Sequence, residues 1–264
     1  MNVKAKEMNR YTWESFSHPK LQVLRKQYHL ENVVSLGSSE YEQQLLLKNW
    51  VCRTLPHGKP SKDYLTLSAI DILEDALAGE HFFWCTQFAQ VFVQCATALG
   101  WYARKVSIDW DHEQDEEDRH HGINDIWSNQ YKKWYSVDSQ NNVNFEKDGI
   151  PLNANEIRNE YLRNKGADLV GVIGNRITLR HYISGTTGFD SPSNYFWFFI
   201  KNRNNYFTEP DNYEAKAYLF QDQHNEAKTW FKVDKRTGKS RPHPMYEKQF
   251  MVVKDVNVCF PEIG

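Results

Sequence analysis

Cysteine is scarce in this 264-residue chain, and its start has no long apolar run. The four cysteines, Cys52, Cys85, Cys95 and Cys259, form no Cys-x-x-Cys pair and are too few for a disulfide-stapled fold. Residues 1–30 contain no apolar stretch of the length of a signal peptide or a membrane span. The chain as given is therefore expected to be soluble, either in the cytoplasm or secreted after removal of a leader.

An excess of either charge is also missing. The 32 Lys and Arg residues nearly balance the 34 Asp and Glu residues, which gives a formal net charge of −2. Because the two signs are interspersed, no basic face is expected that could neutralise a run of phosphates, and a nucleic-acid partner is not expected. Aromatic residues are plentiful, with 9 Trp, 14 Tyr and 15 Phe, and they supply enough bulk for a folded core.

Helical periodicity dominates the first hundred residues. Apolar residues at three- and four-residue spacing predict helices over residues 21–28, 39–54, 68–79 and 85–99. Capping boxes, Ser39-x-x-Glu42 and Ser68-x-x-Asp71, open the second and third of these segments, and Gly79 is a natural residue to end the third. The first three helices are expected to be scaffold.

Beyond residue 100 the apolar period changes to two. Strands are expected over residues 102–108, 122–127, 132–138, 195–200, 217–221, 229–233 and 250–258, with one more helix over about 153–164. This order predicts an α+β fold with N-terminal helices packed on an antiparallel sheet. We expect a helical lead-in over 1–38, a core over 39–165 and a mostly β C-terminal extension over 166–264 that packs on the core.

An acidic segment over residues 109–118 contains seven carboxylates and suggests a calcium loop. It fails the EF-hand pattern, because Gln114 stands where glycine is needed and His120 stands where a bidentate glutamate is needed. A zinc site at His112, His120 and His121 would lack cysteine ligands and would lie in a flexible loop. We therefore expect an acidic surface loop, with no metal and no cofactor.

Cys85 is expected in the first turn of the helix over 85–99. Unpaired N–H groups and the helix dipole favour a thiolate there, although a buried structural thiol is the alternative and a base is needed to decide. Cys95 lies ~15 Å further along the helix axis on the apolar stripe, too far for a disulfide with Cys85, and is predicted to be core. Cys52 and Cys259 receive no predicted role.

A base is suggested by the two strands after the acidic segment. If they form a hairpin that turns at residues 129–130, the numbers of facing residues sum to 259, and His121 faces Asp138 with Cβ atoms roughly 5 Å apart. At that distance a carboxylate can hold an imidazole in one tautomer while the other ring nitrogen faces a nucleophile. His120 would point to the opposite face, although a one-residue bulge would exchange the two histidines.

Four sequence blocks surround these three residues. They are Cys85-x-x-Phe88-Ala89-x-x-Phe92, Leu99-Gly100-x-x-Ala103-Arg104-x-Val106, His121-x-x-x-Asp125-x-Trp127 and Lys133-Trp134-Tyr135-x-Val137-Asp138. In this order and spacing they resemble the core of the transglutaminase-like superfamily, which is similar to papain-type cysteine proteases. The resemblance covers roughly residues 41–165. It implies Cys85 as nucleophile, His121 as general base and acid, and Asp138 as the residue that orients the histidine.

Three features depart from the family pattern. Phe83 stands where many members have glycine, so the approach to Cys85 is expected to be more enclosed. Asp125 stands where glutamate is common and is expected to be structural. The acidic insert over 109–118 is long for the family and is expected to form one lip of the cleft. The β-sandwich domains that flank eukaryotic calcium-dependent members have no clear counterpart here.

The resemblance implies a thiol-dependent acyl-transfer enzyme that forms a thioester with a peptide or carboxamide substrate. We expect a bacterial-type peptidase or amidase rather than a cross-linking enzyme, with a protein or peptide substrate that can be linked to a glycan. The Cys85 N–H is the first expected oxyanion donor, and Trp84, Trp50 and Trp127 are candidates for the second donor or the groove wall. The alternative is a non-catalytic module that binds peptide or glycan on the same fold.

Overall fold

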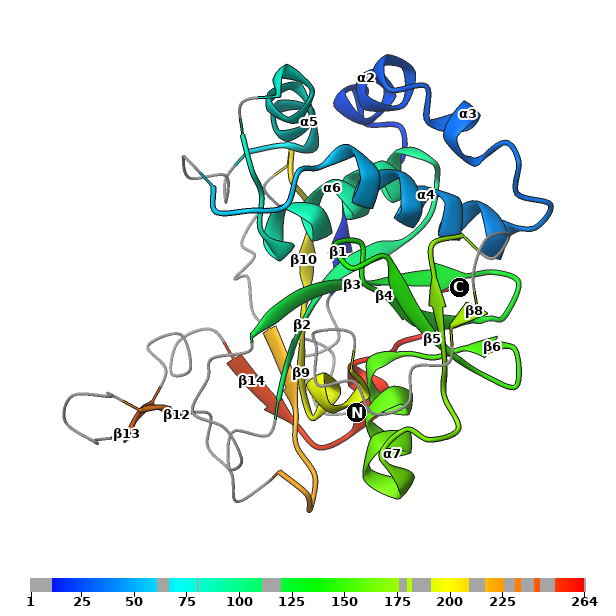
Figure 1. The fold of residues 1–264 in the computed structure, drawn as a ribbon. Helices are drawn as coiled ribbons and strands as arrows, with labels where there is room; N and C mark the ends of the chain where they lie inside the picture. Colours follow the sequence, from blue (N-terminus) through cyan, green and yellow to red (C-terminus); the bar gives the residue numbers. More distant parts are fainter. Residues whose placement is uncertain are drawn as a thin grey trace, which may run out of the picture.

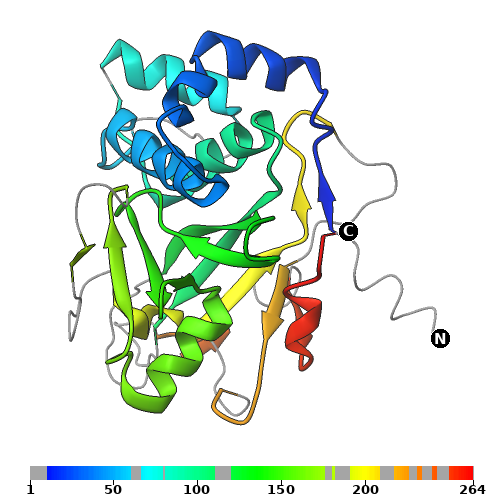
Figure 2. The same cartoon turned by 90° about the vertical axis from the view of Figure 1, so that its right-hand side faces the viewer.

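The fold was analysed in a computed structural model, which describes residues 11–60, 67–79, 81–110, 120–175, 180–181, 191–208, 217–225, 231–233, 240–242 and 250–263. It belongs to the α+β class, as predicted. Its first helices are α2 (Pro19–Gln27), α3 (Leu30–Val34), α4 (Glu40–Thr54), α5 (Ala69–Ala78) and α6 (Cys85–Ala98). These helices gather on one side of the sheets, with α6 nearest to them (Figures 1 and 2).

Helices α4 and α5 each begin at a serine whose side chain satisfies a free backbone N–H group. The predicted box at α5 is complete, because Ser68 accepts a hydrogen bond from the Asp71 N–H and the Asp71 carboxylate accepts one from the Ser68 N–H. At α4, Ser39 accepts from the Glu42 N–H as predicted. The Glu42 carboxylate, however, accepts a hydrogen bond from the N–H of Ser38, the residue before the cap. In the predicted capping box it would accept from the N–H of Ser39 itself.

The largest sheet has six strands in the order β14-β11-β9-β2-β3-β4. These strands are β2 (Ala103–Asp109), β3 (His121–Ser128), β4 (Lys133–Val137), β9 (Trp197–Lys201), β11 (Ala217–Phe220) and β14 (Phe250–Val253). The pairs among β2, β3 and β4 are antiparallel, and β14 is parallel to β11 at the edge. Because β9 pairs with β2, the C-terminal part of the chain continues the sheet of the central part.

A second sheet has four strands in the order β6-β5-β7-β8. Its strands are β5 (Val143–Lys147), β6 (Ile150–Pro151), β7 (Val170–Ile173) and β8 (Arg180–His181). Helix α7 (Ala154–Asn164) starts at a capping box of Asn153 and Glu156. The sequence did not predict these strands, because each is too short to show a clear alternation. The remaining strands pair as β1 (Thr12–Trp13) with β10 (Arg203–Asn204) and β12 (Phe231–Val233) with β13 (Ser240–Pro242).

The hairpin of β3 and β4 has a register different from the predicted one. Trp127 lies opposite Trp134, so the numbers of facing residues sum to 261 rather than 259. The turn takes the four residues 129–132, with Lys132 in the left-handed region at a φ of 53°. Because side chains alternate with a period of two, a shift of two residues leaves each side chain on its predicted face.

Two strands near the C-terminus were predicted too long. The expected strand over 250–258 ends at Val253, and Val256–Val258 forms a short 3-10 helix capped by Asp255. The expected strand over 195–200 begins later, because Pro192–Tyr195 is a 3-10 helix that starts after Ser191. In both places a polar side chain binds a nearby backbone N–H and competes with strand pairing.

Apolar side chains fill both faces of the largest sheet. The cluster on the side of α2 to α6 includes Leu45, Phe92, Cys95, Ala103 and Ile126. The cluster on the other face includes Val106, Ile123, Phe145, Ile157 and Tyr195. Helix α6 is buried along most of its length, and Cys95 is completely buried, as predicted. The first turn of α6 is therefore anchored by a rigid core.

Candidate active site

Cys85 is the first residue of α6. Trp84 is the N-cap, and its backbone N–H donates to the Gln87 side chain at 3.1 Å. The first N–H groups of a helix have no acceptor within the helix, and their partial positive charge favours an anion. The thiol is half-buried, so it lies where a thiolate is stabilised and a substrate can reach it.

The residue two positions before Cys85, Phe83, is hydrogen-bonded to the segment around Pro56 and Gly58. The Phe83 N–H donates to the Pro56 carbonyl at 2.9 Å, and the Gly58 N–H donates to the Phe83 carbonyl at 3.1 Å. Phe83 is completely buried and belongs to the apolar core below the helices. These bonds fix the position at which Cys85 enters the helix.

His121 begins β3, and Asp138 follows the end of β4. Nε2 of His121 lies 2.7 Å from Oδ2 of Asp138, and both side chains are buried. Because β4 ends at Val137, the contact runs across the end of the hairpin rather than between directly opposed residues. The structure thus brings the two side chains together as predicted, but with a different pairing of β3 and β4.

A tight loop after β4 fixes the Asp138 carboxylate. Its Oδ1 accepts hydrogen bonds from the backbone N–H groups of Gln140 and Asn141, both at 2.9 Å. Its Oδ2 accepts from the Asn141 side-chain amide at 2.7 Å, and that amide lies 3.3 Å from Nε2 of His121. Asn141 therefore supports both members of the pair. The sequence analysis missed it, because its only signal was a polar run after Asp138.

The third member of the cluster is Cys85. Since Nε2 of His121 faces Asp138, Nδ1 is the ring nitrogen left for the hydrogen bond between the His121 and Cys85 side chains. Burial acts to raise the pKa of Cys85, but hydrogen bonds from His121, the Gly122 N–H and Thr86 outweigh it and lower that pKa. The thiol therefore ionises more easily than an ordinary cysteine.

The histidine is perturbed in the complementary direction. Burial acts to lower the pKa of His121, but the charge and hydrogen bond of Asp138, helped by Cys85, raise it to about 10. Burial acts to raise the pKa of Asp138, and the contacts with His121 and Asn141 outweigh it and lower that pKa. At neutral pH His121 is therefore positively charged and Asp138 is ionised, and the charge of His121 favours the thiolate form of Cys85.

Gly122 lies where β3 contacts the first turn of α6. A Cβ at this position would lie 3.5 Å from Cys85 Sγ and 3.6 Å from the Thr86 nitrogen. The Gly122 N–H also donates to the thiol. Both Cβ distances are ordinary van der Waals distances, so a methyl group would fit, whereas a longer side chain would extend into the space beside the sulfur. The sequence analysis did not single out Gly122, although it directly follows His121.

Of the three candidate tryptophans, Trp84 directly precedes Cys85. It is 51% exposed and caps α6, so its indole is free to border a substrate. Trp50 packs against the core of the helical side, with its ring centroid 6.4 Å from that of Tyr28. Trp127 is ~20 Å from His121 along β3, and its indole N–H donates to Asn129. The structure therefore places Trp84 at the candidate site and Trp127 away from it.

The other cysteines do not join this cluster. Cys259 is completely buried, and the half-buried Cys52 donates to the Gln140 carbonyl at 3.2 Å. Burial raises the pKa of Cys52, and the nearby charge of Asp138 raises it further. The chain thus contains a second half-buried thiol whose acidity is shifted in the opposite direction.

The expectations for the acidic segment fall largely on residues 111–119, including His112, which lie outside the described residues. At its two ends, the Asp109 carboxylate and the His120 imidazole are 4.0 Å apart, and the His120 ring stacks on Phe199. In the part of the chain that the structure describes, no three His, Cys, Asp or Glu side chains are grouped to hold a metal ion. Over the same residues, no helix has the length and apolarity to cross a membrane.

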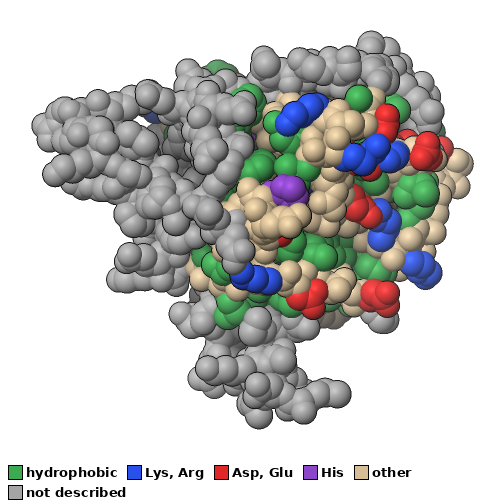
Figure 3. Space-filling model, turned by 90° about the horizontal axis from the view of Figure 1, so that it is seen from below, with side chains coloured by type: hydrophobic (Ala, Val, Ile, Leu, Met, Phe, Trp, Pro, Cys, Tyr) green, Lys and Arg blue, Asp and Glu red, His purple; other side chains and the backbone are tan. Residues whose placement is uncertain are grey.

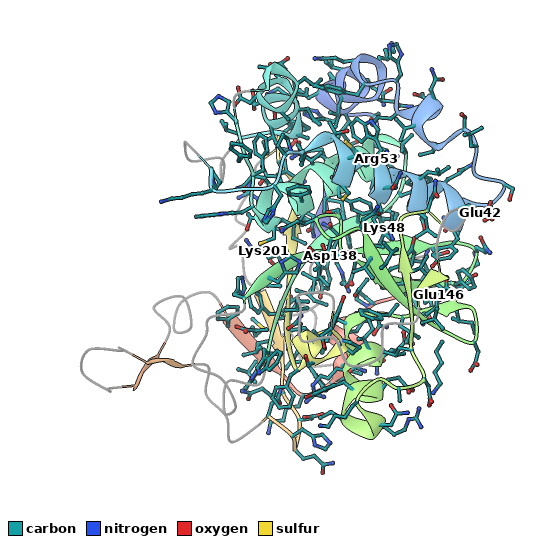
Figure 4. All side chains as sticks on the ribbon, viewed as in Figure 1. Glu42, Lys48, Arg53, Asp138, Glu146 and Lys201 are labelled. Atoms are coloured by element: carbon teal, nitrogen blue, oxygen red, sulfur yellow. The ribbon has the colours of Figure 1, made fainter. Side chains whose placement is uncertain are left out.

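A buried polar network lies behind Asp138. Lys48 donates to the Asn144 side chain at 2.8 Å, Asn144 donates to the Tyr41 hydroxyl at 2.8 Å, and Tyr41 donates to Glu146 at 2.7 Å. Figure 4 shows Lys48 between Asp138 and Glu146. Burial lowers the pKa of Lys48 to about 7, while the charges of Asp138, Cys52 and Glu146 act against that shift. This network was not predicted, because a lysine within a helical repeat is normally exposed.

Comparisons with known proteins show structural likeness but no family. No protein-family model matches the chain, and no curated protein matches it. Among solved structures, a "Putative Cysteine Protease from Cytophaga hutchinsonii" aligns with 53% of this chain at 16% identity and a TM-score of 0.35. The chain covers 43% of that protein. The functional assignment below therefore rests on the residues of the site.

Proposed function

We propose that the protein is a thiol-dependent acyl-transfer enzyme of the transglutaminase-like superfamily, with its catalytic core in residues 39–165. One observation carries the proposal: Cys85, His121 and Asp138 form a continuous hydrogen-bonded chain that ends at a half-buried thiol on a helix N-terminus. A nucleophile, a base and a group that orients the base are the parts that this chemistry requires.

The first half of the reaction acylates the thiol. The Cys85 thiolate attacks the carbonyl carbon of a peptide or carboxamide, and the C–S bond forms as the carbonyl becomes an oxyanion. The Cys85 backbone N–H is positioned to donate to that oxyanion. When the C–N bond breaks, the imidazolium of His121 gives its proton to the departing amine. The products are a thioester on Cys85 and a free amine or ammonia.

The second half resolves the thioester. Neutral His121 accepts a proton from water, the resulting hydroxide adds to the carbonyl, and the C–S bond breaks to release a carboxylic acid and regenerate the thiolate–imidazolium pair. A second amine in place of water would give a new amide. We propose hydrolysis as the main outcome. Water is present at high concentration, whereas transfer to an amine needs a separate binding channel for that amine. Asp138 keeps the His121 ring in one orientation throughout.

The nucleophile can be tested by limited alkylation. We expect sub-stoichiometric iodoacetamide, followed by peptide mapping across pH 5–9, to modify Cys85 at pH 6 while Cys52 reacts only at alkaline pH. Cys52 is a matched internal control, because it is also half-buried but its pKa is raised. Equal labelling of both thiols, with the same pH dependence, would contradict the assignment of Cys85.

The type of reaction can be tested with casein and a fluorescent primary amine. Peptide release without fluorescence in the protein band supports a hydrolase, whereas fluorescence in that band shows amine transfer. In either case the Cys85→Ala variant is expected to be inactive. If a panel of proteins and peptides binds to the wild type but is never converted, although Cys85 is readily alkylated, the alternative of a peptide- or glycan-binding module is favoured.

A further inference from the structure

Two lysines lie on neighbouring strands close to Cys85. In the pairing of β2 with β9, Val106 and Ile200 form the last pair, and Lys105 and Lys201 are the next residues beyond it. Their charges lie close enough to repel each other. Opposed residues of an antiparallel pair carry their side chains on the same face of the sheet, within about 5 Å at Cβ. The two ammonium groups thus share one face, one from the central part of the chain and one from its C-terminal part.

That face is the one on which α6 lies. Lys105 is also opposite Asn124 on β3, and the Asn124 side chain donates to the Ala89 carbonyl of α6 at 2.8 Å. Two residues away on the same face, Ser107 is opposite Gly122, the glycine that adjoins Cys85 Sγ. The alternation of strand side chains therefore places both lysines on the Cys85 side of the sheet.

No described carboxylate pairs with either of the two ammonium groups. Neither lysine side chain bonds to a carboxylate among the residues that the structure describes. Burial lowers the pKa of Lys105 to about 7, repulsion from Lys201 acts in the same direction, and attraction to Cys85 acts against it. An anion placed between the lysines would relieve this repulsion and favour the charged form of Lys105.

The position is also open to a solute. Lys201 is exposed and Lys105 is half-buried. In Figure 4, Lys201 lies at the left-hand side of the molecule, and Asp138 and Lys48 lie further toward its centre. Cys85, Lys105 and Lys201 are thus each at least partly accessible to solvent.

We propose that Lys105 and Lys201 form a subsite for a carboxylate of the acyl substrate, so that acidic peptides or amides are the preferred substrates. This inference rests on the proposed function, since it takes Cys85 as the nucleophile. Lys105 lies near enough to Cys85 to interact with its charge, so an anion held there can belong to the molecule whose carbonyl is attacked. In a peptide this anion is either an Asp or Glu side chain or a C-terminal carboxylate, and both offer the same oxygen pair to an ammonium group.

The subsite can be tested without knowing the substrate, by comparing iodoacetate with iodoacetamide. The two reagents have similar size and leaving group, but only iodoacetate carries a carboxylate. We expect the ratio of their second-order rates at Cys85 to fall about tenfold in Lys105→Gln/Lys201→Gln, and several-fold in each single variant. Lys26→Gln, which changes an exposed lysine on α2, is the matched control and should keep the wild-type ratio.

Two further measurements distinguish loss of the proposed subsite from loss of folding in the variants. In the wild type, 0.5 M salt should slow the iodoacetate reaction but leave the iodoacetamide rate nearly unchanged. In the variants, loss of the Lys105 charge near Cys85 should slow the iodoacetamide reaction somewhat. Iodoacetamide should still modify Cys85 at lower pH than Cys52, which shows that the Cys85–His121 pair is intact. A variant that loses the iodoacetamide reaction is replaced by Lys105→Arg/Lys201→Arg, which should retain the preference for iodoacetate.

Protection of Cys85 from iodoacetamide identifies the source of the carboxylate. N-acetylglutamic acid amide offers only a side-chain carboxylate, N-acetylglutamine offers only a terminal one, and N-acetylglutamine amide offers neither. Protection by either acid, lost in the double variant, supports the subsite. Equal protection by all three, or an unchanged reagent ratio in the double variant, would overturn it while leaving Cys85 as the nucleophile. Failure of iodoacetamide to select Cys85 in the wild type would instead overturn the proposed function itself.

Discussion

Two buried carboxylates on neighbouring strands have contrasting surroundings. Asp125 accepts hydrogen bonds from Arg104 at 2.8 and 3.1 Å and from Ser136 at 2.7 Å, and the Arg104 guanidinium lies 4.2 Å from the Trp134 ring centroid. Both members of this ion pair are completely buried. Asp138 is almost as deeply buried, but its partner is a histidine.

The two pairs differ in whether the positively charged partner can release a proton. An arginine keeps its proton at physiological pH, and Arg104 contacts Asp125 and the rings of three aromatic residues, so we expect this pair to stabilise the fold. His121 can release a proton, and its other neighbour is the half-buried Cys85 thiol. A buried ion pair therefore marks a candidate site only when it continues to a reactive group that a substrate can reach.

The largest effect expected from this contrast is that of Asp138→Asn. Removal of the carboxylate should lower the pKa of His121 and allow the wrong ring tautomer, so that hydrolysis of a responsive peptide falls about 10⁴-fold. The loss should appear in kcat/KM, while circular dichroism and urea unfolding change little, because an amide can keep most of the loop hydrogen bonds. Retention of more than a tenth of the wild-type rate would remove Asp138 from the catalytic group.

The matched change at the other carboxylate, Asp125→Ala, should have the opposite outcome. It leaves the Arg104 guanidinium buried without a counter-charge, which costs about 3–5 kcal/mol of unfolding free energy. We expect a large drop in the urea midpoint, measured together with Asp125→Leu/Arg104→Met, which should restore much of the stability. The rate of Cys85 alkylation per folded molecule should be unchanged. A selective loss of that rate would mean that the two carboxylates do not have separate roles.

A smaller effect is expected on the pH dependence of alkylation in His121→Ala. Without the hydrogen bond from His121, burial should raise the pKa of Cys85 above its ordinary value. The wild type should therefore react with iodoacetamide near pH 6, whereas the variant should react appreciably only at alkaline pH and about 100-fold more slowly at pH 6. Cys52 in the same samples is the reference. A variant profile identical to that of the wild type would exclude the ion pair between Cys85 and His121.

Much of the fold could be predicted from local patterns. Helix α6 was foreseen because its apolar stripe is long, and α5 because its capping box and C-terminal glycine are both unambiguous. The meeting of His121 with Asp138 was foreseen although the assumed hairpin register was wrong, since a two-residue shift preserves the face of each side chain.

What escaped prediction depends on contacts between distant segments. Lys48 can be buried because the Asn144 side chain and the Val172 carbonyl accept hydrogen bonds from its ammonium group. Both residues lie about a hundred positions further along the chain. Lys105 and Lys201 become neighbours only when β9 pairs with β2. No local spacing distinguishes such lysines from exposed ones, because their environment is set by strand order.

The smallest expected effect concerns Lys48, a buried cation that, unlike Arg104, can lose its proton. Its pKa is about 7 in the folded chain and near 10.5 when unfolded. Between these values the unfolded chain binds more protons, so the free energy of unfolding should rise with pH, by at most about 1.36 kcal/mol per unit from this residue. The free energy of unfolding, measured with urea at pH 7.5 and 9.0, should therefore rise with pH by about 2 kcal/mol less in Lys48→Met than in the wild type. The control Lys26→Gln should show the wild-type rise. If Lys48→Met keeps the full pH dependence, Lys48 is charged in the folded protein and forms a fixed ion pair with Asp138 and Glu146, which would place it with Arg104 rather than with His121.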